Sequence, residues 1–277
     1  MPHPLLFDVC HPDVARAVSI ALDEDIRDGD ITTNAAVPAE VQAEARFVAR
    51  EEMVVAGVEL LALLYDAPGL KCSSGARLQP GDEIATVCGP ARALLTRERV
   101  ALNFLQRLSG VATLAARFVS AIKGTGVTML DTRKTTPGLR VLEKMASAAG
   151  GVVNHRMGLW DAVLIKNNHI RIAGGVREAI QRTKRLGLPI EVEARTHAEI
   201  EDALSCGVTR ILLDNMTPAQ AREEIFFIGK RAETEISGGV TLANVRVYAE
   251  AGPDYISSGS ITHSATAVDI NCGIRAL

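Results

Sequence analysis

Residues 127–138 have the sequence VTMLDTRKTTPG, in which a short apolar run is followed by the adjacent cations Arg133 and Lys134. The run at 127–130 is typical of a buried strand, and the Thr-Pro-Gly turn at 136–138 precedes a new helical pattern. Many α/β folds keep their functional groups at the C-terminal ends of parallel strands. The two cations therefore occupy a position where binding or catalytic residues are expected.

The same arrangement, an apolar strand with a polar end, recurs through the rest of the chain. Strands are predicted to end at Asp131, Lys166, Glu193, Asp214, Ser237 and Ser258. Helical patterns separate them, and the later strands recur about every 20 to 25 residues, which is the length of one βα unit. About six or seven units fit between Thr125 and Ser264, so the pattern predicts an α/β fold with an incomplete (β/α) barrel of parallel strands.

The first 110 residues show a different pattern, which predicts a smaller N-terminal α+β sandwich domain. The expected elements are a helix at 13–24, a half-buried strand at 41–50, a helix at 57–65 and two short strands around the turn at 80–82. A long helix is expected from Thr96, as its N-cap, to about Ile122. We expect domains at 1–110 and 111–264, with the tail 265–277 packed on the first.

Composition and charge exclude several classes of protein. The 277-residue chain carries 30 basic and 33 acidic residues, so nothing favours nucleic acid or an anionic membrane as a partner. Its five cysteines are scattered without a Cys-x-x-Cys pair, which argues against a disulfide framework or a zinc site. The N-terminus lacks the features of a signal peptide, and no apolar run approaches the roughly 20 residues of a membrane span. We expect a soluble protein of the reducing cytoplasm.

Five cations are expected to converge at the strand ends if the barrel forms. They are Arg133, Lys134, His155, Arg156 and Lys166. Because like charges repel strongly in a low-dielectric site, such a cluster implies an anionic ligand. Arginine suits carboxylates and phosphates because its planar fork donates two parallel hydrogen bonds, and lysine serves as a compact point charge.

Glu193 and Asp214 end apolar strands, where a buried carboxylate needs a cationic partner. A neighbouring lysine or arginine and a Mg2+ ion are equally compatible with the sequence. Two glycine-containing loops, 237–239 and 258–260, follow the last strands, where many barrels bind phosphate through backbone N–H groups. Together these groups indicate the transfer of a phosphorylated group.

Arg99 is a further candidate for a functional role. It falls in the first turn of the helix expected from Thr96, where the helix dipole disfavours a cation by some tenths of a kcal/mol. Because helix stability does not account for a cation at this position, another role for Arg99 is expected.

Eight motifs together identify a known family. They are ERVALNFLQRLSG (98–110), DTRKTTPGLR (131–140), NHRMGL (154–159), LIKNNH (164–169), EVE (191–193), LDNM (213–216), SGG (237–239) and THS (262–264). In this order and over most of the chain, they resemble the quinolinate phosphoribosyltransferases, also called carboxylating nicotinate-nucleotide pyrophosphorylases, of NAD biosynthesis.

The resemblance implies a Mg2+-dependent reaction of quinolinate with phosphoribosyl pyrophosphate that gives nicotinate mononucleotide, pyrophosphate and carbon dioxide. It implies catalytic roles for Lys134, Lys166, Glu193 and Asp214. It implies that quinolinate and the adjacent phosphates are bound by Arg99, Thr132, Arg133, Lys134, His155, Arg156 and Lys166. It further implies that Glu193 and Asp214 hold Mg2+, directly or through water, and that the 5'-phosphate is bound by Ser237, Gly238, Gly239, Ser258, Gly259 and Ser260. Sites shared between subunits, with Arg99 from the partner, imply a homodimer or larger assembly.

Three segments depart from the family's usual motifs. Residues 145–148 are MASA where Tyr-Ala-Val-Arg is usual, Asn167 stands in place of Asp, and residues 258–260 are SGS in place of Val-Gly-Ala. Three other functions stay open at this point. They are a paralogous phosphoribosyltransferase of the molybdenum-operon type, a Schiff-base aldolase that uses Lys166, and a binding protein that releases no pyrophosphate.

Overall fold

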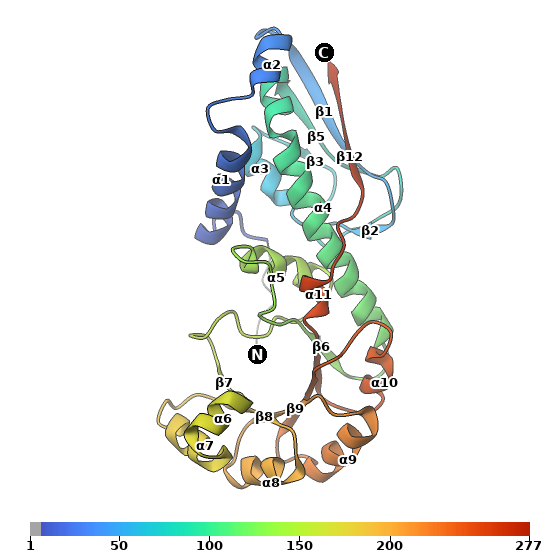
Figure 1. The fold of residues 1–277 in the computed structure, drawn as a ribbon. Helices are drawn as coiled ribbons and strands as arrows, with labels where there is room; N and C mark the ends of the chain where they lie inside the picture. The colour runs from blue at the N-terminus through green and yellow to red at the C-terminus, as the bar shows by residue number, and fades with distance from the viewer. Residues whose placement is uncertain (1–6) are drawn as a thin grey trace. The chain divides into compact units, whose positions relative to one another are not determined.

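The computed structural model describes residues 7–277, which divide into two compact units (Figure 1). The barrel unit comprises Arg117–Lys134 and Val152–Ser260. The sandwich unit comprises the described residues up to Ala116, together with Thr135–Gly151 and Ile261–Leu277. The expectation about a signal peptide falls partly on residues 1–6, which lie outside the described residues.

The barrel unit is built on a six-stranded sheet of parallel strands. These are β6 (Thr128–Leu130), β7 (Val163–Ile165), β8 (Ile190–Ala194), β9 (Arg210–Asp214), β10 (Glu233–Ser237) and β11 (Tyr255–Ser257), in the order β6-β11-β10-β9-β8-β7. Val153 adds a parallel bridge to Leu130. Among residues 7–277, β7 pairs only with β8, so the strands do not close into a ring. The predicted incomplete (β/α) barrel is confirmed.

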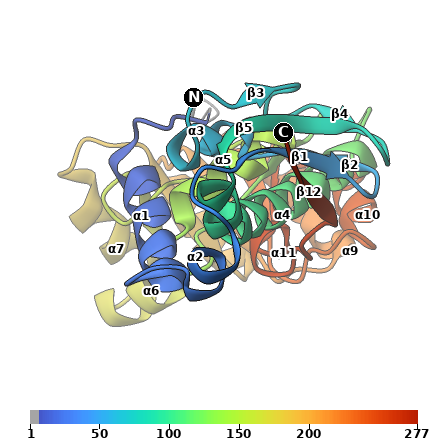
Figure 2. The ribbon, with the colours of Figure 1, turned by 90° about the horizontal axis from the view of Figure 1, so that it is seen from above.

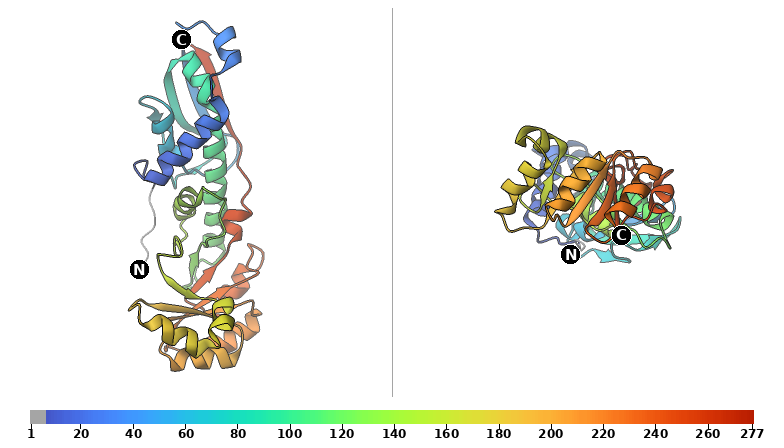
Figure 3. Two further views of the ribbon diagram at one scale, coloured as in Figure 1. Left: turned by 60° about the vertical axis from the view of Figure 1, so that its left-hand side comes forward. Right: turned by 90° about the horizontal axis from the view of Figure 1, so that it is seen from below.

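Short helices alternate with these strands and pack against them (Figures 1 and 3). They are α6 (Asn167–Ala173), α7 (Val176–Lys184), α8 (His197–Ser205), α9 (Pro218–Ile228) and α10 (Val245–Ala249). Capping boxes begin α8 at Thr196 and α9 at Thr217, because each hydroxyl accepts a backbone hydrogen bond three residues on. Helices α8 and α9 thus begin in the sequence shortly after strands β8 and β9 end.

The sandwich unit combines an antiparallel sheet with helices, as predicted. Its sheet order is β12-β1-β5-β3, and β2 pairs with β4 separately. Its strands are β1 (Gln42–Ala49), β2 (Met53–Val54), β3 (Gly69–Leu70), β4 (Arg77–Leu78), β5 (Glu83–Pro90) and β12 (Ile270–Ala276). Its helices are α1 (Pro12–Ile26), α2 (Ile31–Ala36), η1 (Val58–Leu60), α3 (Leu61–Leu64), most of α4 (Ala91–Ala121), α5 (Arg140–Ala149) and most of α11 (Ser260–His263).

The C-terminal tail belongs to this sheet. Strand β12 pairs with β1 from Ala43↔Ala276 to Ala49↔Ile270, and Figure 2 shows the two strands side by side. Alternate residues of β1 are buried, among them Phe47, which enters a core that α4 also lines with Leu105 and Leu108.

The long helix begins earlier than the sequence suggested. Helix α4 starts at Ala91, immediately after Pro90 ends β5, so Thr96 is not its N-cap. The Thr96 hydroxyl instead lies 3.2 Å from Oδ2 of Asp30, the residue that caps α2. Arg99 therefore lies about two turns inside the helix. The argument from the helix dipole does not apply there, because that effect is confined to the terminal turns.

The two compact units do not divide at residue 110. Helix α4 runs unbroken through that position, and residues 135–151 belong to the sandwich unit. The reason is a buried ion pair: Glu143 of α5 is fully buried and accepts hydrogen bonds from Arg107 (2.7 Å) and from the Thr136 hydroxyl (2.7 Å). Such a carboxylate costs several kcal/mol without its partners, so it fixes α5 against α4.

No helix among residues 7–277 combines the length and the apolar character needed to cross a membrane.

Candidate active site

The parallel sheet brings most of the predicted site residues to one edge of the barrel unit. Arg133 and Lys134 follow β6, Lys166 follows β7, and Glu193 lies at the end of β8. Asp214 ends β9 and is in register with Ser237 of β10. Because parallel strands point the same way, their C-terminal ends form a common edge, where the functional groups of such folds lie.

Asp131, the first polar residue after β6, has a structural task. It is fully buried and accepts hydrogen bonds from Nδ2 of Asn154 (2.7 Å) and from the backbone N–H of His155 (2.8 Å). The hydroxyl of Thr132 accepts the backbone N–H of Lys134 (3.0 Å) and so shapes the turn. Asp131 thereby holds the segment at 154–156 beside the cations of the first loop.

The cations of the first two loops lie close enough to affect one another. Burial and then the positive charge of Arg133 lower the pKa of Arg156. Arg156 is about nine-tenths buried, and its Nη1 donates to the carbonyl of Ala162 (3.2 Å). Lys134 and Lys166 are exposed. Adjacent like charges of this kind favour an anionic ligand between them, as the sequence predicted.

His155 has surroundings that the sequence did not indicate. Its Nε2 lies 3.4 Å from Oε2 of Glu191 and 3.5 Å from Oε2 of Glu235, and its Nδ1 accepts the backbone N–H of Arg156 (2.8 Å). Burial lowers the pKa of His155, but the two carboxylates outweigh burial and raise the pKa to about 10. The carboxylates favour the imidazolium, whereas the backbone N–H directed at Nδ1 disfavours a proton on that nitrogen. In both states Nε2 carries a proton that faces the carboxylates.

Glu193 and Asp214 form an adjacent carboxylate pair with side chains about one-tenth exposed. Burial and then the charge of Asp214 raise the pKa of Glu193. Arg195 binds both: its Nε donates to Oδ2 of Asp214 (2.7 Å), and its Nη2 lies 3.5 Å from Oε1 of Glu193. Nδ2 of Asn167 also donates to Glu193. The family's usual aspartate at position 167 would place a third carboxylate here.

The pair satisfies the requirements for a Mg2+ site. Two hard carboxylate oxygen donors lie together at the edge of the sheet, and burial followed by repulsion from Asp214 raises the pKa of Glu193. A divalent cation would relieve that repulsion. Arg195 holds the same oxygens with a side chain that is half exposed. The sequence left a protein cation and a metal ion equally open, and the structure supplies the protein cation.

The glycine loop after β10 requires glycine at position 238. Gly238 has φ +93°, and a Cβ there would lie 2.3 Å from Oδ1 of Asn215. Gly239 follows with φ +64°. Among the described residues, the backbone N–H groups of these two glycines donate no hydrogen bond, which leaves both available to an anion.

The serines of the two loops are largely bonded to each other and to the backbone. Ser257 donates to the hydroxyl of Ser237 (2.9 Å), and Ser258 donates to the carbonyl of Val240 (2.7 Å) and lies 2.7 Å from Oγ of Ser260. These bonds join the loops that follow β10 and β11. Ser258 is buried, so its hydroxyl serves the loop structure first.

Arg99 is exposed on α4 in the sandwich unit. Its neighbour Arg97 is bound within that unit, because Nη1 of Arg97 donates to the carbonyl of Leu64 (2.8 Å). Of these two arginines, Arg99 is the one exposed to solvent.

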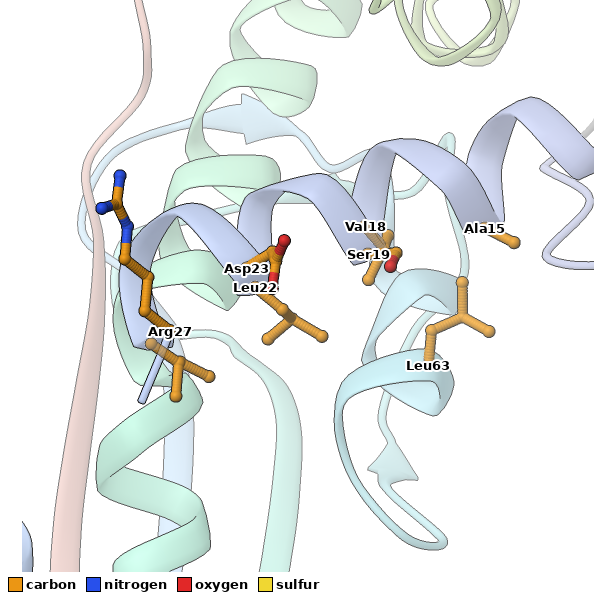
Figure 4. A pocket seen from close by; sticks show the side chains of 8 residues that line it. Ala15, Val18, Ser19, Leu22, Asp23, Arg27 and Leu63 are labelled. Carbon is orange, nitrogen blue, oxygen red and sulfur yellow. The ribbon is translucent and has the colours of Figure 1, made fainter. Parts of the chain in front are cut away.

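Two cavities among the described residues contain neither the carboxylate pair nor the glycine loops. One of about 420 Å3 lies between α1 and α3, where Val18, Leu22 and Leu63 line it together with Asp23 and Arg27 (Figure 4). Its lining is mainly apolar and contains none of the candidate residues. Another, of about 520 Å3, lies along β7 and is lined mainly by apolar side chains, with Arg156 and His169 among them.

Sequence reasoning missed four residues of the site. They are Arg195, Glu191, Glu235 and Asn167, of which Asn167 is a partner of Glu193. A strand places residues two apart on the same face, so Glu191 was recoverable from Glu193 and Glu235 from Ser237. Their common partner, His155, comes from another segment and carried no such signal.

Comparison with known proteins shows the family of the chain. The family model of the quinolinate phosphoribosyl transferase C-terminal domain matches residues 111–272, and that of the N-terminal domain matches residues 30–109. The chain is 41% identical to nicotinate-nucleotide pyrophosphorylase [carboxylating] of Mycobacterium leprae, covering 94% of this chain and 97% of that protein. It is 40% identical to the chloroplastic enzyme of the same name from Oryza sativa, covering 95% of this chain and 79% of that protein.

The fold agrees as well. The crystal structure of NadC from Streptococcus pyogenes superimposes with a TM-score of 0.91 at 37% identity, covering 98% of this chain and 99% of that one. Both family models, the curated relatives and the solved structure point the same way. The chain belongs to the quinolinate phosphoribosyltransferase family.

Proposed function

We propose that this chain transfers the phosphoribosyl group of phosphoribosyl pyrophosphate to quinolinate, with loss of carbon dioxide, in a Mg2+-dependent step of NAD biosynthesis. The products are nicotinate mononucleotide, pyrophosphate and CO2. One observation carries the proposal: a cation cluster, a carboxylate pair and a glycine loop with open N–H groups share one edge of a parallel sheet. They match a dicarboxylate, a metal-bound pyrophosphate and a ribose 5'-phosphate.

The cations after β6 and in the 154–156 segment bind the quinolinate carboxylates. Arg133 and Arg156 offer forked donors, and Lys134 adds a point charge. Lys166 lies near Glu193 and lowers the pKa of that carboxyl, against the larger effects of burial and of Asp214. Lys166 is therefore placed for the pyrophosphate side of the substrate. Gly238 and Gly239 bind the 5'-phosphate through their N–H groups.

Bond formation needs no covalent intermediate with the protein. The quinolinate nitrogen donates its electron pair to C1 of the ribose while the bond from C1 to pyrophosphate breaks, through a transition state with oxocarbenium character. Lys134 and Lys166 stabilise the charge that develops on the leaving group. Glu193 and Asp214 would hold a Mg2+ ion, directly or through water, and the ion would add electrostatic stabilisation of the departing pyrophosphate.

Decarboxylation follows from the charge on the ring. The bond between C2 and its carboxylate breaks, and its electron pair stays on C2 beside the newly cationic nitrogen. A proton from water then completes nicotinate mononucleotide. Arg133 and Arg156 keep the dicarboxylate in position until the bond breaks.

A second copy of the chain completes the site in this proposal. Arg99, exposed on α4, is donated to the partner's quinolinate pocket, so that the active unit is a homodimer or a larger assembly. All five cysteines are free, which supports a reducing compartment such as the cytoplasm.

The decisive experiment incubates the protein with quinolinate, phosphoribosyl pyrophosphate and Mg2+ and measures nicotinate mononucleotide and released CO2. We expect both products in equal amounts, and neither with EDTA nor with Lys134→Ala or Glu193→Ala. Full turnover by either variant would overturn the assigned roles. Product from another aromatic acid, with none from quinolinate, would replace the substrate by that of a paralogous enzyme.

A further inference from the structure

Two buried carboxylates in the barrel unit have no task in the proposed reaction. Glu191 of β8 is 8% exposed and Glu235 of β10 is fully buried. An unpaired buried carboxylate destabilises a fold by several kcal/mol, so each of these two glutamates needs a partner. Both lie at ion-pair distance from the same atom, Nε2 of His155, at 3.4 and 3.5 Å.

The register of the strands explains why these carboxylates meet. Glu191 precedes Glu193 by two residues on β8, and Glu235 precedes Ser237 by two residues on β10, so each shares a face with a candidate site residue. The cluster thus forms a layer directly before the C-terminal edge that carries the site. Nη1 of Arg210 lies 3.7 Å from Oε2 of Glu235 and closes the layer on the side of β9.

His155 connects this layer to the first loop. Asp131 fixes its backbone by accepting its N–H at 2.8 Å, and the two glutamates face its Nε2. Its remaining nitrogen, Nδ1, accepts the backbone N–H of Arg156 at 2.8 Å. Both ring nitrogens are therefore engaged within the protein, and the orientation of the ring is coupled to the backbone of Arg156.

We propose that Glu235, together with Glu191, is a positioning residue: it fixes the imidazole of His155 and, through Nδ1, the backbone that presents Arg156 to the dicarboxylate. The proposal rests on the proposed function, which makes Arg156 a quinolinate ligand. Small displacements of a binding group cost much of its effect, so a supporting contact of this kind has a measurable role.

The test compares Glu235→Gln and Glu191→Gln with a matched control, Glu233→Gln. Glu233 lies on the same strand, pairs with Tyr255 (3.2 Å) and shares Arg210 (2.9 Å) with Glu235, so this variant controls for a loss of contacts to Arg210. For Glu235→Gln we expect KM and Kd for quinolinate to rise about tenfold, with KM for phosphoribosyl pyrophosphate changed less than twofold. The control should leave both constants unchanged. An equal loss for both substrates would indicate a merely structural role and overturn the proposal.

Two further measurements test the positioning role of Glu235 without following turnover. The first follows quinolinate binding by calorimetry and by the fluorescence of Trp160, the single tryptophan, which is 80% exposed and four residues from Arg156. The second records the imidazole nitrogens of His155 by 15N NMR, with His155→Gln to assign the signal. We expect Nε2 to be protonated in the unsubstituted protein, and we expect the nitrogen signals of His155 to change in Glu235→Gln. An unchanged pattern would contradict the proposal.

Metal binding at the same cluster is the competing outcome. The ligand atoms of His155, Glu191 and Glu235 all lie within 4.8 Å of one another, a spacing that also suits a metal ion. One equivalent of zinc in the purified protein, lost in Glu235→Gln, would overturn the positioning role. If Glu235→Gln does not fold, Glu191→Gln carries the decision. If quinolinate is not a substrate while the NMR pattern is as expected, the proposed function fails and the contact from Glu235 to His155 stands.

Discussion

At the scale of single residues, Glu193 is a carboxylate whose burial has a cost in stability. Burial and the charge of Asp214 raise the pKa of Glu193 in the folded chain. A raised pKa means that stability from this group is fully present below the unfolded value and is lost as the pH rises through the folded value. Ionised Glu193 therefore weakens the fold near neutral pH.

We accordingly expect Glu193→Gln to unfold at a higher temperature than the unsubstituted protein at pH 7. The difference should shrink as the pH falls toward 4.5, because the native carboxyl then becomes protonated. Added Mg2+ should also reduce it, since the ion stabilises only the unsubstituted site. Thermal unfolding between pH 4 and 8 measures this, and a lower melting temperature at pH 7 would contradict it.

Gly238 is a second residue with a single possible identity. A Cβ there meets Oδ1 of Asn215 at 2.3 Å, and φ is +93°. We expect Gly238→Ala to raise KM for phosphoribosyl pyrophosphate about tenfold or more, because the loop must shift and its N–H groups leave the phosphate. Gly252→Ala is the control: φ is +86° there, but nothing lies within 4 Å of its Cβ. Equal increases in KM for the two variants would indicate that backbone strain alone, and not the close approach to Asn215, is the cause.

At the scale of elements, the turn between β8 and α8 places Arg195 next to the carboxylates of Glu193 and Asp214. Arg195 donates to Asp214 at 2.7 Å and lies 3.5 Å from Glu193, yet its side chain is half exposed. Its backbone N–H is tied to Oε2 of Glu199 in the first turn of α8 (2.7 Å). The backbone is thus held while the side chain can turn to solvent, so a metal ion at the proposed Mg2+ site would compete with Arg195 for the same oxygens.

Arg195→Gln is therefore expected to bind Mn2+ about fivefold more tightly than the unsubstituted protein, since one exposed ion pair no longer competes. Calorimetry or electron paramagnetic resonance measures the dissociation constant, with Glu193→Gln to show that the ion occupies this pair. Arg177→Gln removes a comparable exposed pair with Asp202 (2.6 Å) and should leave binding unchanged. Weaker Mn2+ binding by Arg195→Gln would make the arginine a ligand of the substrate rather than a competitor.

The elements also show the limits of local patterns. Strand ends were predicted within about two residues, because burial imposes an apolar run whatever the partner. The start of α4 was missed, because the helix begins at Ala91 directly after Pro90 ends strand β5, with no loop between them. The strands around the turn at 80–82 are present, yet β4 pairs with β2 and β5 with β1 and β3. Such pairings depend on distant residues.

At the scale of the whole molecule, the proposed exchange of Arg99 between copies has a direct test. Arg99→Ala and Lys134→Ala should each be nearly inactive alone. After mixing and reassociation, about half of the dimers carry one variant of each kind, and one of their two sites then has both groups intact, which predicts about a quarter of full activity. No recovery, with subunit exchange verified by mass, would place Arg99 outside the partner's site.

The sequence by itself determined the order of the elements and the chemistry of the strand ends, from Arg133 and Lys134 to the glycine loops. These follow from local rules: apolar periodicity, turn residues and the need of a charge for a partner. The tertiary structure decided which partner each charge has. It placed His155 between Glu191 and Glu235, Arg195 on Glu193 and Asp214, and Glu143 against Arg107. These pairs join residues from different segments, and only folding brings them within the few ångströms over which a buried charge is compensated.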